Sequence, residues 1–533
     1  MSAYNALTAS SSAERSPLTA LAVASGAAAA PSLRFYHLNV SSGPASRRRC
    51  ATAHTVVRAP RSDGSEGLVL WVQQSARSST AHADALAAAV GVAAAAHLGR
   101  ARWLAKDVAV VFADRGCSPL AAAKAWLSVY NSERSLFDFP RAGLMQQALA
   151  LELPHGVDVR AAELAVHGWQ GLLPNADLYY QIKRNLDIHT GLPVRLAAAP
   201  SLPAWLRRGA AALAAMLPGF DDAKGDRYVS ELATAAGFGL QLAAGEPDGA
   251  HGAFLELGVD AATLRLVGGK SHREAHAAGV DAAAAHALTA VELALRTCNN
   301  LQERLHHSTA LYLLLSPDRM ITIAVYLAPP GLLLAAALGQ VLLEARRATA
   351  AAWRPAWLCL AAIHAAALIS ALAWHSVVRR PSAGGVDSGP PLAQTAAGTV
   401  VAAAALAWWA GDISPAAVAA VEPNSNSSSS GGIGPPLRVA AATVLLMEGV
   451  SMLLGHWALC WLLLSAALPL LAATAAAPCG SKAGNLAALA VACLPAAGIL
   501  RACWSWSTTS LAFYLLTAQL GATLLCCMLS LLM

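Results

Sequence analysis

The sequence predicts an α/β domain followed by an α-helical bundle of about seven membrane spans. Two observations lead to this prediction. Residues 319–533 hold only 9 of the 37 basic and 5 of the 31 acidic side chains, whereas the preceding residues alternate between short β-rich runs and helical stretches. The whole chain is 56% apolar and 13% charged, far from the composition of a soluble protein. A net charge of +6 without a dense basic block argues against nucleic acid as a partner.

Residues 1–50 predict no clear element, because their apolar stretch, residues 17–31, is too short to span a bilayer. Between residues 54 and 268, runs rich in apolar and β-branched side chains alternate with helical stretches. A strand–helix–strand order at this spacing predicts a mostly parallel sheet with helices on both faces. The expected strands are residues 67–73, 107–114, 144–153, 162–168 and 262–268, and the expected crossover helix is residues 81–99.

A helix is expected over residues 281–315, where Leu288, Val291 and Leu295 belong to one apolar stripe at helical spacing. This helix would lead the α/β domain, residues 51–318, down to the bilayer. Residues 319–533 would form the bundle, because most of their apolar stretches approach the roughly 20 residues that a spanning helix needs. The expected spans are residues 321–343, 357–378, 392–413, 437–454, 457–477, 486–503 and 511–533. The charges of the connecting loops are too evenly divided to orient this bundle.

Several short segments, in order between residues 58 and 343, resemble one protein family. The clearest is residues 168–178, Gly-Trp-Gln-Gly-Leu-Leu-Pro-Asn-Ala-Asp-Leu, which resembles the signature G-x-x-G-x-L-P-N-x-D-L. The chain therefore resembles the peptidase-like (Gaa-type) subunit of the glycosylphosphatidylinositol (GPI) transamidase, the complex that attaches GPI anchors to proteins. The supporting segments are residues 103–108, 125–130, 251–255, 301–306 and 311–314.

This resemblance implies one N-terminal span, a luminal α/β domain similar to zinc aminopeptidases, and seven further spans in the endoplasmic reticulum membrane. We expect a non-catalytic subunit that helps to bind the GPI lipid, the C-terminal signal of the proprotein, or both. The chemistry would belong to a separate cysteine-protease-like subunit of the complex. The expected first span is not evident in residues 1–50, which points either to a truncated gene model or to a degenerate remnant at residues 17–31.

The resemblance to zinc aminopeptidases raises the question of an active site. Such a site needs several carboxylate and imidazole ligands at one edge of the sheet, together with a separate Glu as general base. Residues 73–78 offer no His or Asp where the first ligands would lie, and Asp114 is followed by Arg115 instead of a second carboxylate. Glu152 and His251 remain near the third and last positions.

Two interpretations of these residues are open. Asp114, Glu152 and His251 could form a surviving mononuclear zinc site, which would make the chain a membrane-bound zinc aminopeptidase with a reduced metal site. Alternatively they are vestigial and satisfied by hydrogen bonds. We favour the second, because Arg115 would repel a cation and the loss of the first ligands removes the bridging geometry. We accordingly expect no catalytic residue, no bound metal and no cofactor. A transporter with a luminal cap is a further alternative, but the spans show no internal repeat.

Two other groups of residues are candidates for function. In the signature, Trp169, Pro174, Asn175 and Asp177 are expected to be structural or to form an interface: Asn175 and Asp177 would cap the following helix, and an exposed Trp169 would suit an interface anchor. At the entrance to the membrane, polar side chains could contact the phosphoinositol and glycan of a GPI lipid, or could be ordinary interfacial residues. These lipid-proximal candidates are Asn300, Arg304, His306, His307, Tyr312, Arg319 and Tyr326.

Overall fold

The computed structural model divides the chain into two compact units, Met1–Gln241 with Gly245–Thr322, and Leu242–Ala244 with Ile323–Met533. The structure describes residues 34–41, 47–73, 81–113, 118–132, 139–155, 159–196, 208–209, 212, 216, 222–268, 277–300, 311–346, 356–358, 360–361, 434–455 and 457–475.

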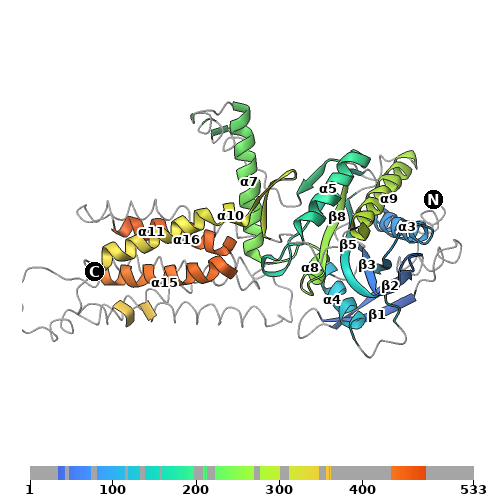
Figure 1. Ribbon diagram of the computed structural model, residues 1–533, viewed down its shortest axis with the longest axis horizontal. Helices are drawn as coiled ribbons and strands as arrows, with labels where there is room; N and C mark the ends of the chain where they lie inside the picture. The colour runs from blue at the N-terminus through green and yellow to red at the C-terminus, as the bar shows by residue number, and fades with distance from the viewer. Residues whose placement is uncertain are drawn as a thin grey trace, which may run out of the picture. The chain divides into compact units, whose positions relative to one another are not determined.

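The first unit is built on an eight-stranded sheet with the order β1-β2-β4-β3-β5-β8-β6-β7. Its four neighbouring strands β4, β3, β5 and β8 are parallel, whereas β1 and β2 pair antiparallel, β2 pairs antiparallel with β4, and β6 pairs antiparallel with β8 (Figure 1). The predicted α/β class is confirmed, and the sheet is mixed instead of mostly parallel. The strands are β1 (Arg34–Ser41), β2 (Arg47–Val57), β3 (Glu66–Gln73), β4 (Asp107–Ala113), β5 (Leu144–His155), β6 (Val159–Ala165), β7 (Val194–Leu196) and β8 (Asp260–Gly268).

Helices cover both faces of this sheet, as predicted. On one face, α3 (Ala81–Leu98) and α9 (Ala277–Asn300) contact β3 and β5, and α5 (Ala176–Thr190) packs against α9. On the other face lie α4 (Pro119–Tyr130) and α8 (His251–Leu255). The core beneath α4 and α8 is aromatic: the ring centroid of Trp71 lies 6.2 Å from that of Trp126 and 6.3 Å from that of Phe254, in edge-on geometry. All seven residues of β4 are buried, as expected for a central parallel strand.

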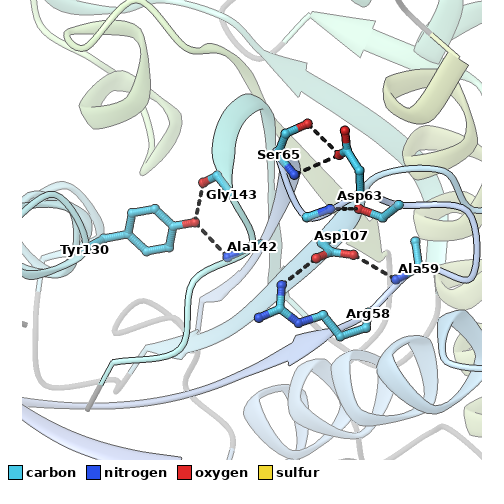
Figure 2. Close-up of polar contacts among 10 residues, drawn as sticks. Arg58, Ala59, Asp63, Ser65, Asp107, Tyr130, Ala142 and Gly143 are labelled. Carbon is cyan, nitrogen blue, oxygen red and sulfur yellow. Dashed lines mark hydrogen bonds and ion pairs between the residues drawn. The ribbon is translucent and has the colours of Figure 1, made fainter. Parts of the chain in front are cut away.

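The amino ends of the central strands are held by polar contacts (Figure 2). At the start of β4, the Asp107 carboxylate accepts hydrogen bonds from the Ala59 backbone N–H at 2.8 Å and from Arg58 Nη1 at 2.5 Å. At the entrance to β5, the Tyr130 hydroxyl donates to the Gly143 carbonyl at 2.8 Å and accepts from the Ala142 N–H at 2.9 Å. These contacts fix the loops at the amino edge of the sheet.

The predicted helix over residues 281–315 is wrong at its C-terminal end. The helix α9 ends at Asn300, and β9 (Tyr312–Ser316) pairs with β10 (Arg319–Thr322) in an antiparallel hairpin. Residues 301–310 lie outside the described part. The Leu-rich run of β9 fits either a helix or a strand, and Pro317 favours a turn because it cannot continue a helix. The hairpin contacts α5 and also α7 (Asp222–Ala244), for example where Tyr179 donates from its hydroxyl to the Pro317 carbonyl at 3.2 Å.

In the second unit, α11 (Ala328–Ala345), α15 (Gly434–Gly455) and α16 (Trp457–Ala475) pack against one another, and α10 (Ile323–Tyr326) precedes them. Gly449 permits this packing, because a Cβ there would lie 2.6 Å from Leu334 Cδ2. Within the described ranges, one helix has the length and composition of a membrane span: Ile323–Leu343, with 21 residues and a mean hydropathy of 1.6. The predicted span 437–454 lies within α15, and the predicted span 457–477 contains all of α16. The predicted spans 392–413, 486–503 and 511–533, and most of 357–378, lie outside the described part, so the number of seven stays a prediction.

Candidate functional site

A cluster of buried polar side chains lies at the carboxyl edge of the central strands, on the face covered by α4 and α8. Gln73 of β3 is in register with Ala113 of β4 and with Glu152 of β5, and Glu152 is in register with Arg265 of β8. Residues two apart on a strand share a face, so Gln73 lies beside Trp71, whose Nε1 donates to it at 3.0 Å. This edge is where parallel sheets usually place ligands.

Glu152 and Arg265 form an ion pair across adjacent strands. Arg265 Nε donates to Glu152 Oε2 at 2.8 Å, and the exposed fractions of the two side chains are only 19% and 12%, respectively. The guanidinium also donates to the backbone carbonyl of Asp248. Burial lowers the pKa of Arg265, but the charges of Glu152 and Asp248 outweigh burial and raise it. The carboxylate of Glu152 is therefore neutralised by a permanent cation from its own chain.

His251, at the start of α8, is fully buried with both ring nitrogens in use. Its Nε2 lies 3.1 Å from the backbone carbonyl of His167, and its Nδ1 lies 2.7 Å from Thr263 Oγ1. Because a carbonyl only accepts, Nε2 carries the proton, and Nδ1 accepts from the Thr263 hydroxyl. Burial lowers the pKa of His251 to about 4, so the imidazole is neutral at physiological pH. Neither nitrogen keeps a free lone pair for a metal.

Asp248 and His167 complete the cluster behind His251. The Asp248 carboxylate lies 3.3 Å from His251 Nε2 and 3.7 Å from His167 Nδ1. Burial raises the pKa of Asp248, but the electrostatic influence of His167, His251 and Arg265 outweighs it, and the pKa lies below its usual value. The ring of His167 also packs on Phe238 of α7, with centroids 4.3 Å apart. The cluster thus contains two carboxylates, one guanidinium and two imidazoles.

The described residues do not fit a zinc ion. Among them, no group of three or more His, Cys, Asp or Glu side chains could hold a metal. Of the predicted vestigial set, the structure brings Glu152 and His251 to the same region of the sheet, each engaged with a neighbouring side chain, while Asp114 and Arg115 lie outside the described part. Sequence reasoning missed Arg265, although a single charge inside the apolar run of β8 was a visible signal.

The signature segment lies next to this cluster. Trp169–Gly171 forms a short 3-10 turn in which Gln170 has a φ of 51°, a left-handed conformation that is rare for a side-chain-bearing residue. Asn175 is the N-cap of α5, and its side chain accepts from the backbone N–H of Asp177 at 2.9 Å. Pro174 precedes it and is buried. The turn and the cap therefore set the path of the chain from β6 into α5.

The signature also contacts two other parts of the chain. The Gln170 N–H donates to the Gly245 carbonyl at 2.9 Å, after the end of α7. Gly168 lies against residues 251–255, a second segment that resembles the family, where a Cβ on Gly168 would lie 2.8 Å from Leu255 Cδ1. Trp169 is half-buried, with the ammonium of Lys124 4.5 Å from its ring centroid. A Cβ on Gly168 would also lie 3.0 Å from the Leu172 carbonyl oxygen, so a larger residue at 168 would have to displace the Leu255 side chain and crowd this backbone.

The lipid-proximal candidates are only partly brought together. Tyr312 is buried in β9, with its ring centroid 6.4 Å from that of Phe238, and Arg319 of β10 binds Glu231 of α7 at 2.6 and 2.8 Å. Asn300 is exposed at the end of α9, and Tyr326 is buried in the second unit. The candidates Arg304, His306 and His307 lie outside the described residues.

Comparison with known proteins adds a family match. The family described as "Gaa1-like, GPI transamidase component" matches residues 49–526. The GPI transamidase component GAA1 of Saccharomyces cerevisiae is 27% identical over 280 residues, which cover 52% of this chain and 39% of that protein. The component gaa1 of Schizosaccharomyces pombe is 26% identical over 311 residues, covering 57% and 47%. The aligned region thus spans less than half the length of each of these relatives.

The chain is also similar to solved structures, among them those of two bacterial proteins. Glutaminyl cyclase from Porphyromonas gingivalis has 11% sequence identity and a TM-score of 0.31, with 57% of this chain and 98% of that chain covered. A Zn-dependent exopeptidase from Parabacteroides distasonis has 8% identity and a TM-score of 0.30, with 56% and 97% covered.

Proposed function

Because the chain belongs to the Gaa1-like family of GPI transamidase components, we propose that it is a non-catalytic subunit of that complex in the endoplasmic reticulum membrane. In this proposal the first unit is luminal and the second is a multi-span bundle. The chain helps to bind the GPI lipid, the C-terminal signal of the proprotein, or both. A cysteine-protease-like subunit then exchanges the signal's peptide bond for an amide with the GPI ethanolamine.

The observation that carries the non-catalytic assignment is the ion pair between Arg265 and Glu152. A hydrolytic metal site at this edge would need Glu152 as a ligand or as a general base. Instead its carboxylate accepts a hydrogen bond from Arg265 Nε at 2.8 Å. Both ring nitrogens of His251 are also hydrogen-bonded, one to the Thr263 hydroxyl and the other to the His167 carbonyl. Glu152 and His251 are therefore both engaged in hydrogen bonds within their own chain.

The alternative is a zinc aminopeptidase that uses Asp114 together with Glu152 and His251. Purification of the tagged full-length chain in mild detergent separates the two proposals, because partners and metal can be measured in the same sample. We expect a cysteine-protease-like subunit and other multi-span proteins at near-equal stoichiometry by mass spectrometry, without zinc. A solitary chain that carries one or two zinc ions would establish the alternative.

A double-mutant cycle on the ion pair tests the same assignment at residue level. Glu152→Leu or Arg265→Met alone leaves one buried charge without its partner and should cost about 3–5 kcal/mol of stability. The double variant removes both charges, so its loss of stability should be smaller than the sum of the two single losses, although the Asp248 carbonyl also loses its donor. In yeast cells depleted of their own component, the double variant should support surface display of a GPI-anchored reporter about as well as the unmodified chain. A stable double variant with no display would show that Glu152 takes part in function.

A further inference from the structure

A row of charged side chains crosses the sheet of the first unit from its centre to its edge. Glu152 of β5 is in register with Arg265 of β8. Arg265 is in register with Glu163 of β6, and Glu163 is in register with Arg195 of β7. Residues in register on neighbouring strands point to the same face of a sheet. These four side chains, which we call the charge row, therefore share one face and alternate in sign.

The inner members of the charge row act on one another. Arg265 Nε donates to Glu152 Oε2, and these two side chains are only 19% and 12% exposed, respectively. Burial lowers the pKa of Arg265, but nearby carboxylates, Glu163 among them, outweigh burial and raise that pKa. Glu163 is half-buried and Arg195 is exposed. The charge row thus becomes more accessible toward β7.

Arg195 ends the charge row and has an opposite charge of the row on its inner side alone. It forms no hydrogen bond or ion pair with another described residue, and β7 is the last described strand in the order of the sheet. Its neighbours Val194 and Leu196 are buried, and β7 contacts α5, so Arg195 points to the face opposite α5. A carboxylate in the next position outward would continue the alternation of charge.

The backbone of β7 also has an open side. The Ala162 N–H donates to the Pro193 carbonyl at 3.1 Å, so the backbone groups of Pro193 and Arg195 are directed toward β6. These groups alternate along a strand, which leaves the N–H and C=O of Val194 and Leu196 directed away from β6. No described strand lies beside them. An edge of this kind can accept an added strand through main-chain hydrogen bonds.

We propose that the outer edge of β7 binds an extended segment of a partner protein, with an acidic side chain of that segment beside Arg195. Main-chain hydrogen bonds to Val194 and Leu196 hold the segment in place. Arg195 selects its sequence, because Asp or Glu at the adjacent position is attracted and Lys or Arg is repelled. The contact goes beyond the proposed function, which assigns no surface to any partner.

A charged residue and a preceding proline can also protect a sheet edge from aggregation. Protection requires only that the charge be exposed. The register of Arg195 with three further charges of alternating sign is not needed for protection, and it favours recognition of an acidic segment.

Photocrosslinking in native membranes tests this contact. In the full-length chain, a benzophenone amino acid replaces Pro193, which is exposed and lies two residues from Arg195 on the same face of β7. The same amino acid at Gln181, an exposed residue of α5, is the control. Crosslinked peptides are identified by mass spectrometry. We expect one peptide of a co-purifying protein, containing Asp or Glu, several-fold above its level with the label at residue 181.

Substitutions in the labelled chain then test how the segment is recognised. Arg195→Glu should reduce the adduct several-fold, because it places like charges side by side, and changing the acidic residue of the captured peptide to Arg should restore the adduct. Arg184→Glu, at an exposed arginine of α5, is the matched control and should change little. Val194→Pro removes an N–H that faces the open edge and should also weaken the adduct.

Four results would overturn the inference: an adduct within this chain, an adduct with lipid, an adduct no more frequent than with the label at Gln181, or an adduct that survives Arg195→Glu or Val194→Pro. Each variant is first shown to keep the thermal stability of the unmodified chain, so that misfolding cannot produce these results. The proposed function fails separately, because it is judged by which proteins and metals co-purify, whereas this contact is judged by the crosslinked peptide.

Discussion

At His251, burial determines the protonation state of the imidazole. The ring is fully buried, its Nδ1 accepts from Thr263, and burial lowers its pKa to about 4. The neighbouring carboxylate of Asp248 would favour the charged form, but it does not reverse the shift. A neutral imidazole with a fixed tautomer is a good structural link between α8 and β8, and a poor proton carrier near neutral pH.

This shift predicts that the free energy of unfolding falls as the pH decreases from about 6.5 to about 4. Above this range the imidazole of His251 is neutral in both states. Within it the unfolded chain takes up a proton that the folded chain excludes, so unfolding is favoured. The full effect is about 3 kcal/mol. The lowered pKa of Asp248 acts the same way only at lower pH, below its ordinary value of 3.8.

Thermal unfolding of the full-length chain in detergent, followed between pH 4 and 7, measures this dependence. His251→Asn keeps hydrogen-bonding groups and cannot take up the proton, so its profile should be flatter over the same range. An unchanged slope in the variant would assign the pH dependence to other groups.

At the scale of single elements, the two hydrogen bonds of the Tyr130 hydroxyl at the amino edge of the sheet are the most direct to test. The Tyr130 hydroxyl serves both the Gly143 carbonyl and the Ala142 N–H (Figure 2). Tyr130→Phe keeps the aromatic packing and leaves both backbone groups without this partner. We expect a loss of about 2 kcal/mol in the free energy of unfolding, measured by thermal or denaturant unfolding. Tyr180→Phe, at a half-exposed tyrosine of α5, is the matched control and should change little.

The elements that sequence could predict are those with one consistent signal. The strands β3, β4, β5 and β8 are apolar runs of strand length, and each was placed within a few residues. The strand β2 begins Arg-Arg-Arg, which hides it among polar residues, and β9 is a leucine run that fits helix and strand alike. Edge strands and hairpins depend on partners that a local pattern does not reveal.

The site was predictable only in part for the same reason. Glu152 and His251 follow from the resemblance to peptidases. Arg265 could be noticed as a charge in an apolar strand, but its pairing with Glu152 depends on the register of β5 against β8. Asp248 and His167 come from separate loops, and no spacing along the chain connects them. Sequence thus indicates which groups are present, and register decides which of them neutralise one another.

For the whole molecule, the charges of the loops do not determine which side of the membrane the first unit occupies. The proposed function places the first unit in the lumen of the endoplasmic reticulum. In sealed microsomes, a protease added outside should therefore leave a fragment containing residues 47–322 intact, and should degrade it once detergent opens the membrane. A cytosolic loop tag serves as the control for protease activity. Digestion of residues 47–322 in sealed microsomes would reverse the orientation.

The β9–β10 hairpin also determines how mechanical load would pass along the chain. Thr322 ends β10 and Ile323 begins the next helix, so the chain passes from the hairpin into the apolar span without an intervening loop. The hairpin is tied on one side to α5 through Lys183 and Asp318, and on the other to α7 through Arg319 and Glu231. Tension on the span would therefore be divided between two helices, one of which begins at the signature.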